Sequence, residues 1–456
     1  MAKYKAYPEY KDSGVEWLGD IPGHWKTISI SRLFSRIKRT GYTEKELLSV
    51  YRDYGVIPKS SRDDNNNKPS EDLSPYQLVQ PNDLVMNKMK AWQGSIAISE
   101  YEGIVSPAYF VYQPNNSLFE LAHPKYVHYL LRNPIYVTQY LSRSKGIRVN
   151  QWDLDPDEFR NIELLLPSKV EQEKIYNFLD HETAKIDNLI EKQQQLIELL
   201  KEKRQAVISH AVTKGLNTDV PMKDSGVKWL GEVPNHWLVR RLKHTANLQS
   251  GIPKGKDLAG KNVVSVPMLR VANVQDGYLD LEDIHNIDIE PSQLERYLLR
   301  NGDVLMNEGG DNDQLGRGAV WSAQLDNCIH QNHVFAIRPE NIESEWLDML
   351  TRAAYAKFHF YRVAKQSTNL ASISSTNIKE TPLLIPPTKE RIDILKFIKL
   401  QLDRLKATEE LSINQIMLLQ ERRTALISAA VTGKIDVRDW VAPYTQDVEE
   451  SQEATA

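Results

Sequence analysis

The sequence contains one cysteine, Cys328, in 456 residues. A single thiol excludes an intrachain disulfide, so we expect a reducing compartment and a fold stabilised by its core alone. The opening residues, MAKYKAYPEYKDSG, lack the apolar stretch of a secretory leader, and no apolar run is long enough to span a membrane. These absences predict a cytoplasmic protein.

The chain also lacks an excess of positive charge, since 57 Lys+Arg face 61 Asp+Glu and the net charge is -4. The total therefore gives no sign of nucleic-acid binding, and the distribution of charge matters more than its sum. Residues 351–379 carry Arg and Lys but no acid, and a smaller basic cluster spans 143–148. The acidic segment 435–456 is expected to be a disordered tail.

Motifs for catalysis are missing as well. Residues 251–257, GIPKGKD, end in Asp and have the wrong glycine spacing for a phosphate-binding loop, and no G-x-G-x-x-G follows a strand. Cys328, His330 and His333 have a spacing that zinc tolerates, but no fourth ligand is evident and the first half has no equivalent cysteine, so no metal is expected. No nucleophile, base and acid form a set. We predict no catalytic, cofactor-binding or metal-binding residues.

What the chain does contain is a duplication. Residues 11–25, KDSGVEWLGDIPGHW, recur as residues 223–237, KDSGVKWLGEVPNHW, in unbroken register. We call these the opening segments. Their tryptophans are expected to anchor each segment to its domain, and the recurrence of His24 and His236 favours a structural hydrogen bond over acid–base chemistry.

Each copy ends in a long helix, predicted over 168–215 and 388–434. Ser168 and Glu171 form a capping box, in which hydroxyl and carboxylate both satisfy amide groups of the first turn. Apolar residues trace an imperfect heptad seam, formed by Ile175, Leu179, Ile186, Leu189, Leu196, Leu200 and Val207, and by Ile394, Ile398, Leu405, Leu419 and Leu426. The two helices could pair with each other. Alternatively, each packs on its own domain or drives homo-oligomerisation.

Between these segments lie two globular stretches that resemble each other weakly. Both show a turn followed by a short apolar strand, at 81–87 and 301–307, then alternating strands, helices over 124–140 and 344–361, and a last strand ending in proline. Residues 51–74 are read as an inserted loop. The fold class is α+β: two mixed α/β domains, 1–167 and 216–387, and two long helices, in an internal repeat.

This plan resembles the specificity subunit of a type I restriction-modification enzyme, over about residues 7 to 440. The resemblance rests on the tandem SGV-x-W-L-G-x-x-P-x-H-W segments and on the R-x-A-x-I-S-x-A-V-T helix ends. It implies that each globular part is a target-recognition domain reading half of a split, asymmetric site in double-stranded DNA. It further implies that the two long helices pair as an antiparallel coiled coil, which gives the repeat a pseudo-two-fold character. The implied partners are two methyltransferase subunits docked on the helices, and restriction subunits. S-adenosylmethionine, ATP and Mg would belong to those partners, and none to this chain.

Base reading requires Arg for guanine and Asn or Gln for adenine, whereas phosphate contacts require only cations. The predicted DNA-binding residues are polar, basic or aromatic and lie in short loops: Lys88, Lys90, Trp92, Gln93, Arg143, Lys145, Arg148, Asn150 and Gln151 in the first domain, and Asn307, Arg317, Gln331, Asn332, His333, Lys365, Gln366, Ser367 and Asn369 in the second.

The competing interpretations are a non-catalytic scaffold that holds partner proteins on its long helices, and a stand-alone enzyme. Turnover by the chain alone would support the enzyme, and failure to bind DNA in the presence of partners would support the scaffold. The target bases, the gap between half-sites and the helix register do not follow from the sequence.

Overall fold

The computed structural model describes residues 4–52, 54–62, 68–148, 151–253, 260–310, 315–366 and 371–442. The chain divides into two compact units. The first unit contains Met1–Gln193 and Asn414–Ala456, and the second contains Gln194–Ile413. None of the helices in these described stretches has the length and apolar character needed to cross a membrane.

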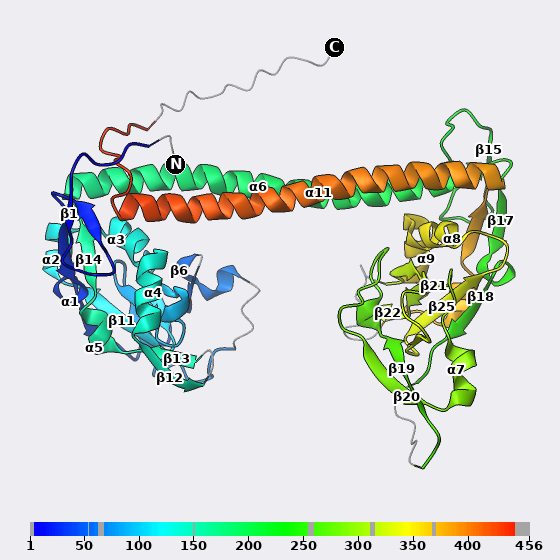
Figure 1. Cartoon of the computed structure of the whole chain (residues 1–456), viewed down its shortest axis with the longest axis horizontal. Helices are drawn as coiled ribbons and strands as arrows, with labels where there is room; N and C mark the ends of the chain where they lie inside the picture. Colours follow the sequence, from blue (N-terminus) through cyan, green and yellow to red (C-terminus); the bar gives the residue numbers. More distant parts are fainter. Residues whose placement is uncertain are drawn as a thin grey trace. The chain divides into compact units, whose positions relative to one another are not determined.

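The first unit is built on an antiparallel four-stranded sheet (Figure 1). Its strands, in spatial order, are β4 (Phe34–Ile37), β11 (Tyr109–Pro114), β8 (Leu84–Asn87) and β9 (Ile96–Ile98). Four two-stranded ladders flank it: β1 (Tyr10–Asp12) with β2 (Asp20–Pro22), β3 (Lys26–Ser29) with β14 (Glu163–Leu166), β5 (Leu48–Tyr51) with β6 (Gly55–Pro58), and β7 (Gln77–Val79) with β10 (Gly103–Val105). Its short helices are α1 (Ile30–Leu33), α2 (Asn116–Leu121), α3 (Pro124–Leu131), α4 (Pro134–Ser142) and α5 (Pro156–Arg160).

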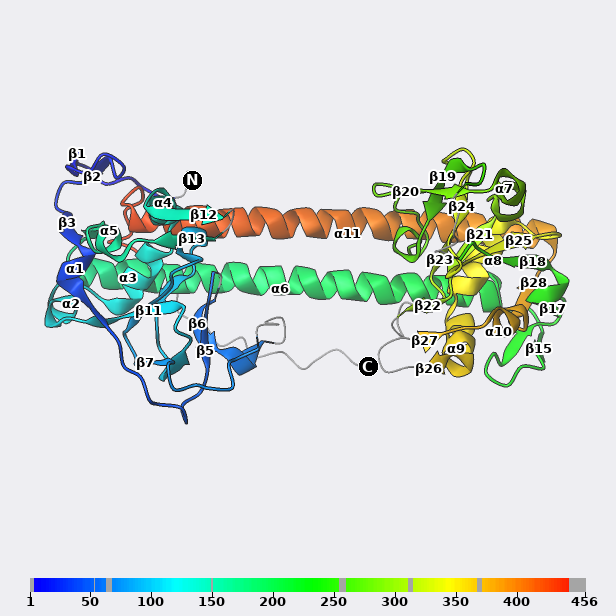
Figure 2. The same ribbon diagram turned by 90° about the horizontal axis from the view of Figure 1, so that it is seen from below.

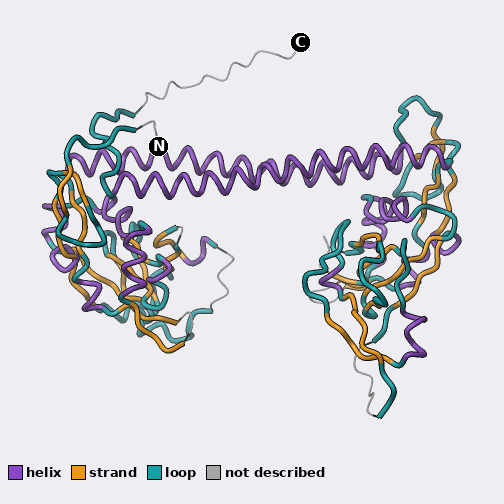
Figure 3. The backbone as a smooth tube through the Cα atoms, viewed as in Figure 1, coloured by secondary structure: helices purple, strands orange, loops and turns teal. Residues whose placement is uncertain are grey.

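The second unit, like the first, combines strands and helices (Figure 3), and it contains an antiparallel four-stranded sheet of the same kind. The sheet order is β18 (Ala246–Ser250), β25 (Val334–Pro339), β21 (Val304–Asn307) and β23 (Gly318–Val320). The smaller ladders are β15 (Met222–Asp224) with β16 (Glu232–Pro234), β17 (Leu238–Arg241) with β28 (Pro382–Ile385), and β20 (His285–Ile289) with β19 (Val264–Leu269) and β24 (Ile329–His330). Its short helices are α7 (Pro291–Tyr297), α8 (Ser344–Arg352), α9 (Ala354–Val363) and α10 (Ser375–Lys379). The predicted strands at 81–87 and 301–307 are thus confirmed as β8 and β21.

The long helices are confirmed as α6 (Lys169–Lys214) and α11 (Thr388–Val431). Each contributes to both units, and within each unit the two lie side by side and antiparallel (Figures 1 and 2). In the first unit Arg423 pairs with Asp187 at 2.8 Å, and in the second Arg204 pairs with Glu409 at 2.8 Å. The prediction that the helices pair with each other is therefore confirmed.

The helix seam follows the predicted heptads except in its middle. Ile175, Leu179, Ile186 and Leu200 are buried, but Leu189 is 47% exposed. A straight helix has 3.6 residues per turn, whereas a heptad pattern assumes 3.5, so the buried face gradually shifts relative to the heptad positions. At this point it has shifted from Leu189 to Ile190, which is half-buried.

Each unit's core includes both long helices. In the first unit Phe178 and Leu179, near the start of α6, share a cluster with Ala430 and Val431 at the end of α11. In the second unit Ile394, near the start of α11, shares a cluster with Ala211 and Val212 at the end of α6. Therefore α6 begins in the core of the first unit and ends in the core of the second, whereas α11 begins in the second and ends in the first.

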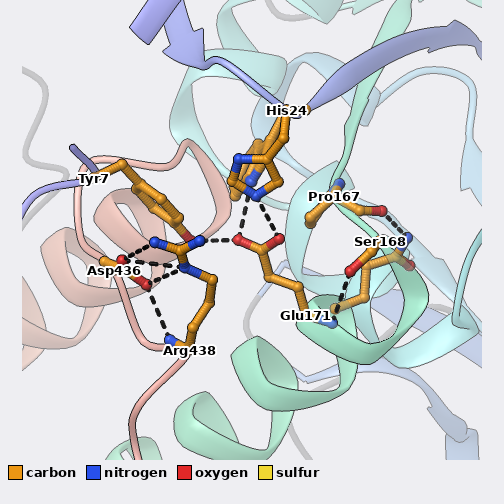
Figure 4. A network of polar contacts seen from close by, with 9 residues as sticks. Tyr7, His24, Pro167, Ser168, Glu171, Asp436 and Arg438 are labelled. Atoms are coloured by element: carbon orange, nitrogen blue, oxygen red, sulfur yellow. Dashed lines mark hydrogen bonds and ion pairs between the residues drawn. The ribbon is translucent and has the colours of Figure 1, made fainter. Parts of the chain in front are cut away.

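The opening segments fix the first turn of each long helix. The Glu171 carboxylate accepts hydrogen bonds from Tyr7 Oη at 2.7 Å and Trp25 Nε1 at 3.1 Å, and lies 2.7 Å from His24 Nε2 (Figure 4). Glu390 has the equivalent contacts with His236 and Trp237. The structural roles predicted for these histidines and tryptophans are confirmed.

The complete capping box predicted at 168–171 is wrong. Ser168 Oγ does accept from the Glu171 amide at 3.3 Å, which is half of the motif. The carboxylate does not return to the backbone, because the opening segment offers it stronger side-chain donors.

Two further predictions need correction. The helices expected over 124–140 and 344–361 are each broken in two, by the Asn133–Pro134 cap in the first unit and by an extended Ala353 in the second. The stretch 51–74, expected to be a loop, contains β6 and a 3-10 turn at Lys59–Ser61. The strand was missed because Gly55–Pro58 is a strand only through its pairing with β5, which the sequence of this stretch does not reveal.

Candidate nucleic-acid interface

In the first unit, four predicted residues lie in the turn that follows β8. Asn87 ends the strand, and its Oδ1 accepts from the Met89 amide at 3.1 Å. Trp92 Nε1 donates to the Met89 carbonyl at 3.0 Å. These contacts hold the turn in one shape, with Lys88 half-buried and Lys90 and Gln93 exposed at the surface.

A hairpin packs against this turn. It is formed by β12 (Ser144–Arg148) and β13 (Gln151–Leu154), which pair antiparallel with a bulge between Lys145 and Arg148. The Leu154 amide donates to the Lys88 carbonyl at 3.2 Å, and the rings of Trp92 and Trp152 lie 5.0 Å apart. The structure thus brings together two groups of predicted residues that are about 60 positions apart in the sequence.

The cations of this surface make only weak pairs with carboxylates. Lys88 Nζ lies 3.8 Å from Asp153, and Lys145 Nζ, on a side chain 77% exposed, lies 3.9 Å from Asp155. Exposed pairs of this kind contribute little to stability, so both cations can exchange their partner for a phosphate. Arg143 differs, because Gln139 on α4 binds its guanidinium.

Some predicted residues fall outside what is described here. The backbones of Arg148 and Gln151 lie in the hairpin, but their side chains are outside the described part of the structure. Asn150, Ser367 and Asn369 lie wholly outside the described residues.

The second unit has a matching arrangement after β21. A three-stranded ladder forms from β22 (Gly309–Gly310), β27 (Ala371–Ser372) and β26 (Lys365–Gln366), and places Lys365 and Gln366 in an exposed strand. The Ile373 amide donates to the Glu308 carbonyl at 2.8 Å. The Glu308 amide in turn donates to the His333 carbonyl at 2.9 Å, which brings the predicted 331–333 segment to the same place.

Two residues predicted in this unit are tied to backbone. Asn307 is fully buried, and its Nδ2 donates to the carbonyls of Val271 and Val274 at 3.1 and 3.0 Å. Arg317 Nη2 donates to the Val271 carbonyl at 3.4 Å. Both residues are therefore bound to the backbone of the 271–274 turn. By contrast, Gln331 and Asn332 are half-buried and His333 is exposed.

Two backbone hydrogen bonds of the two units are equivalent. In the first unit, Leu154, in the segment that follows α4, donates to Lys88, the residue after β8. In the second unit, Ile373, in the segment that follows α9, donates to Glu308, the residue after β21. The side chains at these equivalent positions have opposite charge. Glu308 Oε2 lies 2.8 Å from His333 Nδ1, on the surface where Lys88 approaches Asp153 in the first unit. Glu308 was absent from the predicted set, although aligning the two apolar strands would have revealed it.

The possible zinc ligands serve other roles. Burial raises the pKa of the Cys328 thiol to about 12 and lowers the pKa of His330, whose Nδ1 lies 2.6 Å from the Val334 carbonyl. His333 faces Glu308 instead. Within the described residues, no three His, Cys, Asp or Glu side chains gather in a way that could hold a metal.

Chemically, each surface combines main-chain rigidity with exchangeable polar groups. Lysine can bind phosphate without reading sequence, whereas glutamate accepts from the cytosine amino group and glutamine pairs with adenine in the major groove. A two-stranded ribbon of the β12–β13 kind fits that groove.

A family model described as the type I restriction modification DNA specificity domain matches residues 22–199. The specificity subunit of the type I restriction enzyme EcoKI from Escherichia coli is 22% identical over 91% of this chain and 90% of its own length. The StySPI specificity subunit from Salmonella potsdam is also 22% identical, with the same coverage.

One solved structure, described as showing complex assembly and conformational transition of the type I R-M system, matches with a TM-score of 0.59 and 16% identity. It covers 90% of this chain and 98% of its own, and so shows the same fold. These matches make the chain similar to type I restriction-modification specificity subunits over about nine tenths of its length, with the same duplicated plan of opening segment, mixed domain and long helix.

Proposed function

We propose that this chain selects the DNA sequence on which a type I restriction-modification complex acts, with each unit reading one half of a split, asymmetric target. The observation that carries the proposal is the shared backbone hydrogen bond, Leu154 to Lys88 and Ile373 to Glu308. It supports one scaffold used twice with different reading groups. Different side chains at equivalent places should select different half-sites.

The long helices would set the gap between the half-sites. With 46 residues, α6 is about 69 Å long at about 1.5 Å per residue. Successive major grooves on one face of B-DNA are about 34 Å apart, so a helix of this length is long enough to separate two readers by one or two turns.

The same helices would dock two methyltransferase subunits, to which the restriction subunits are added. Large apolar side chains are exposed along both, including Leu199 at 60%, Leu411 at 66% and Leu418 at 63%. Exposed apolar side chains grouped on one element are typical of protein interfaces. In this proposal the chain is non-catalytic and cytoplasmic, and S-adenosylmethionine, ATP and Mg act on the partner subunits.

The test is a methylome. The chain would be expressed with its methyltransferase subunit, and methylated adenines would be mapped by long-read sequencing, with the methyltransferase alone as control. We expect one asymmetric motif in two blocks separated by a fixed gap, present only when both proteins are expressed. A folded complex that adds no methylation would refute the proposal and favour a protein scaffold.

A further inference from the structure

The first unit has a groove that the predicted residues do not include. It has a volume of about 390 Å³ and lies where β4 meets β11, between Arg36 and Lys38 on one side and Pro107 and Phe110 on the other. The Arg36 guanidinium lies over the Phe110 ring, with its Cζ 4.0 Å from the ring centroid. A guanidinium stacked on a ring keeps its N–H edge free for a bidentate contact.

The two cations of this groove have no counter-ion among the described residues: no carboxylate lies within ion-pair distance of Arg36 or Lys38, and both are exposed. The next cation along the strand behaves differently, since Arg39 pairs with the buried Asp83. No acidic residue lines the groove. Its charge is therefore available to an anionic ligand.

The groove is continuous with the hairpin surface. The Lys88 amide donates to the Ala108 carbonyl at 3.2 Å, directly beside Pro107 of the groove. Tyr109, which also lines the groove, pairs with Asn87 in the sheet. Any duplex seated on the Lys88 turn would extend its backbone over Arg36 and Lys38.

The second unit lacks this feature at the equivalent positions. The strand register shows which residues are equivalent. Leu84 and Val304 occupy the same place in the two units, and they pair with Tyr112 and Ile337. Tyr112 pairs in turn with Arg36, and Ile337 with Leu248, so Leu248 is the counterpart of Arg36. Leu248 packs on the core of its unit, and Phe335, the counterpart of Phe110, is 3% exposed. At these equivalent described positions the second unit therefore has no cation to match Arg36.

We propose that Arg36 and Lys38 bind backbone phosphates of the DNA duplex held by the first unit, beside the bases that its hairpin reads. This inference rests on the proposed function. Phosphate contacts carry no base information, so the groove adds affinity and register without changing the sequence selected.

The test uses the complex with methyltransferase and a duplex carrying the methylated motif. The variant R36Q/K38Q is compared with K11Q/K26Q, which removes two exposed lysines from the β1 and β3 strands of the same unit. Dissociation constants are measured from about 50 to 200 mM salt. Each lost phosphate contact lowers the salt slope by about 0.9, so R36Q/K38Q should lose about 1.8. The variant should bind more weakly than the wild type, by a factor that shrinks about twelvefold between about 50 and 200 mM salt, with an unchanged motif. K11Q/K26Q should match the wild type.

Three results would overturn the inference. A slope for R36Q/K38Q equal to that of the wild type would show that no phosphate is bound there. A changed first half-site would show that the groove reads bases instead. Failure of the wild-type complex to bind its motif would overturn the proposed function, and this inference with it.

Discussion

Replacing Glu171 with alanine should loosen the opening segment of the first unit more than the same change at Glu390 loosens the second. Glu171 is 4% exposed and accepts from two donors on buried residues, Tyr7 Oη at 2.7 Å and Trp25 Nε1 at 3.1 Å. A buried donor left without an acceptor costs about 1–3 kcal/mol, so E171A should cost about 4 kcal/mol. His24 is exposed enough to bind water instead.

At Glu390 the loss should be about half as large. Its side chain is 30% exposed, and of its two donors only Trp237 is fully buried. One orphaned donor costs about 2 kcal/mol. The paired variants share chemistry and position in the repeat, so each is the control for the other.

Hydrogen exchange followed by mass spectrometry measures the effect locally. A loss of about 4 kcal/mol in the free energy of local opening should speed exchange about a thousandfold in peptides covering 4–26, against about thirtyfold for 222–238 in E390A. Glu171→Gln, which keeps one acceptor oxygen, should fall between E171A and wild type. Equal acceleration in both units would refute the reasoning that donor burial sets the cost.

Three further outcomes are expected. Burial and the neighbouring Arg132 lower the pKa of His128 to about 3, so the stability that its neutral form gives the first unit is complete above about pH 6.5 and is lost as the pH falls towards 3. Urea unfolding should therefore show a free energy of unfolding about 2 kcal/mol lower at pH 5 than at pH 7, and His128→Gln should remove this difference. An identical difference in the variant would contradict this origin. Glu308→Gln should change the second block of the methylation motif and leave the first unchanged, whereas a change in both blocks or in neither would exclude local reading. Inserting one heptad in both α6 and α11 at facing positions should lengthen the unspecified gap without altering either block, and a motif with the old gap would show that the helices do not set it.

The duplication and the main elements could be predicted because their signals are local. The repeated opening segments, the turn before each buried strand and the helices free of Pro and Gly all depend on neighbouring residues. The break between α8 and α9 could not be predicted in this way, because the Ala354 amide is capped by Ser209 Oγ at 2.8 Å, from a helix 145 positions earlier in the chain. The capping box failed for the same reason, since the partners of Glu171 are Tyr7, His24 and Trp25, 146 to 164 positions earlier in the chain.

The candidate site shows the same division. Residues near the turn after β8 could be selected by type and location, but exposure could not, and Asn307 proved to be fully buried. Arg36 and Lys38 were not among the predicted residues, because only the fold places them beside Phe110 and Pro107. Which cations keep a free charge depends on where carboxylates lie in three dimensions.

The equivalence of Lys88 and Glu308 explains how such a surface can change its target without losing its fold. The hydrogen bonds that attach each following segment to its turn use only main-chain atoms, from Leu154 and Ile373. Substituting the side chain at either acceptor position leaves these bonds in place, so charge at the surface can invert at little cost in stability. The equivalent residues Asp83 and Asp303 each pair with an arginine, although Arg39 follows β4 and Arg338 lies in β25. Under the proposed function, DNA recognition and folding depend on different atoms of these residues, and substitutions at Lys88 or Glu308 should alter DNA selection before they alter the free energy of unfolding.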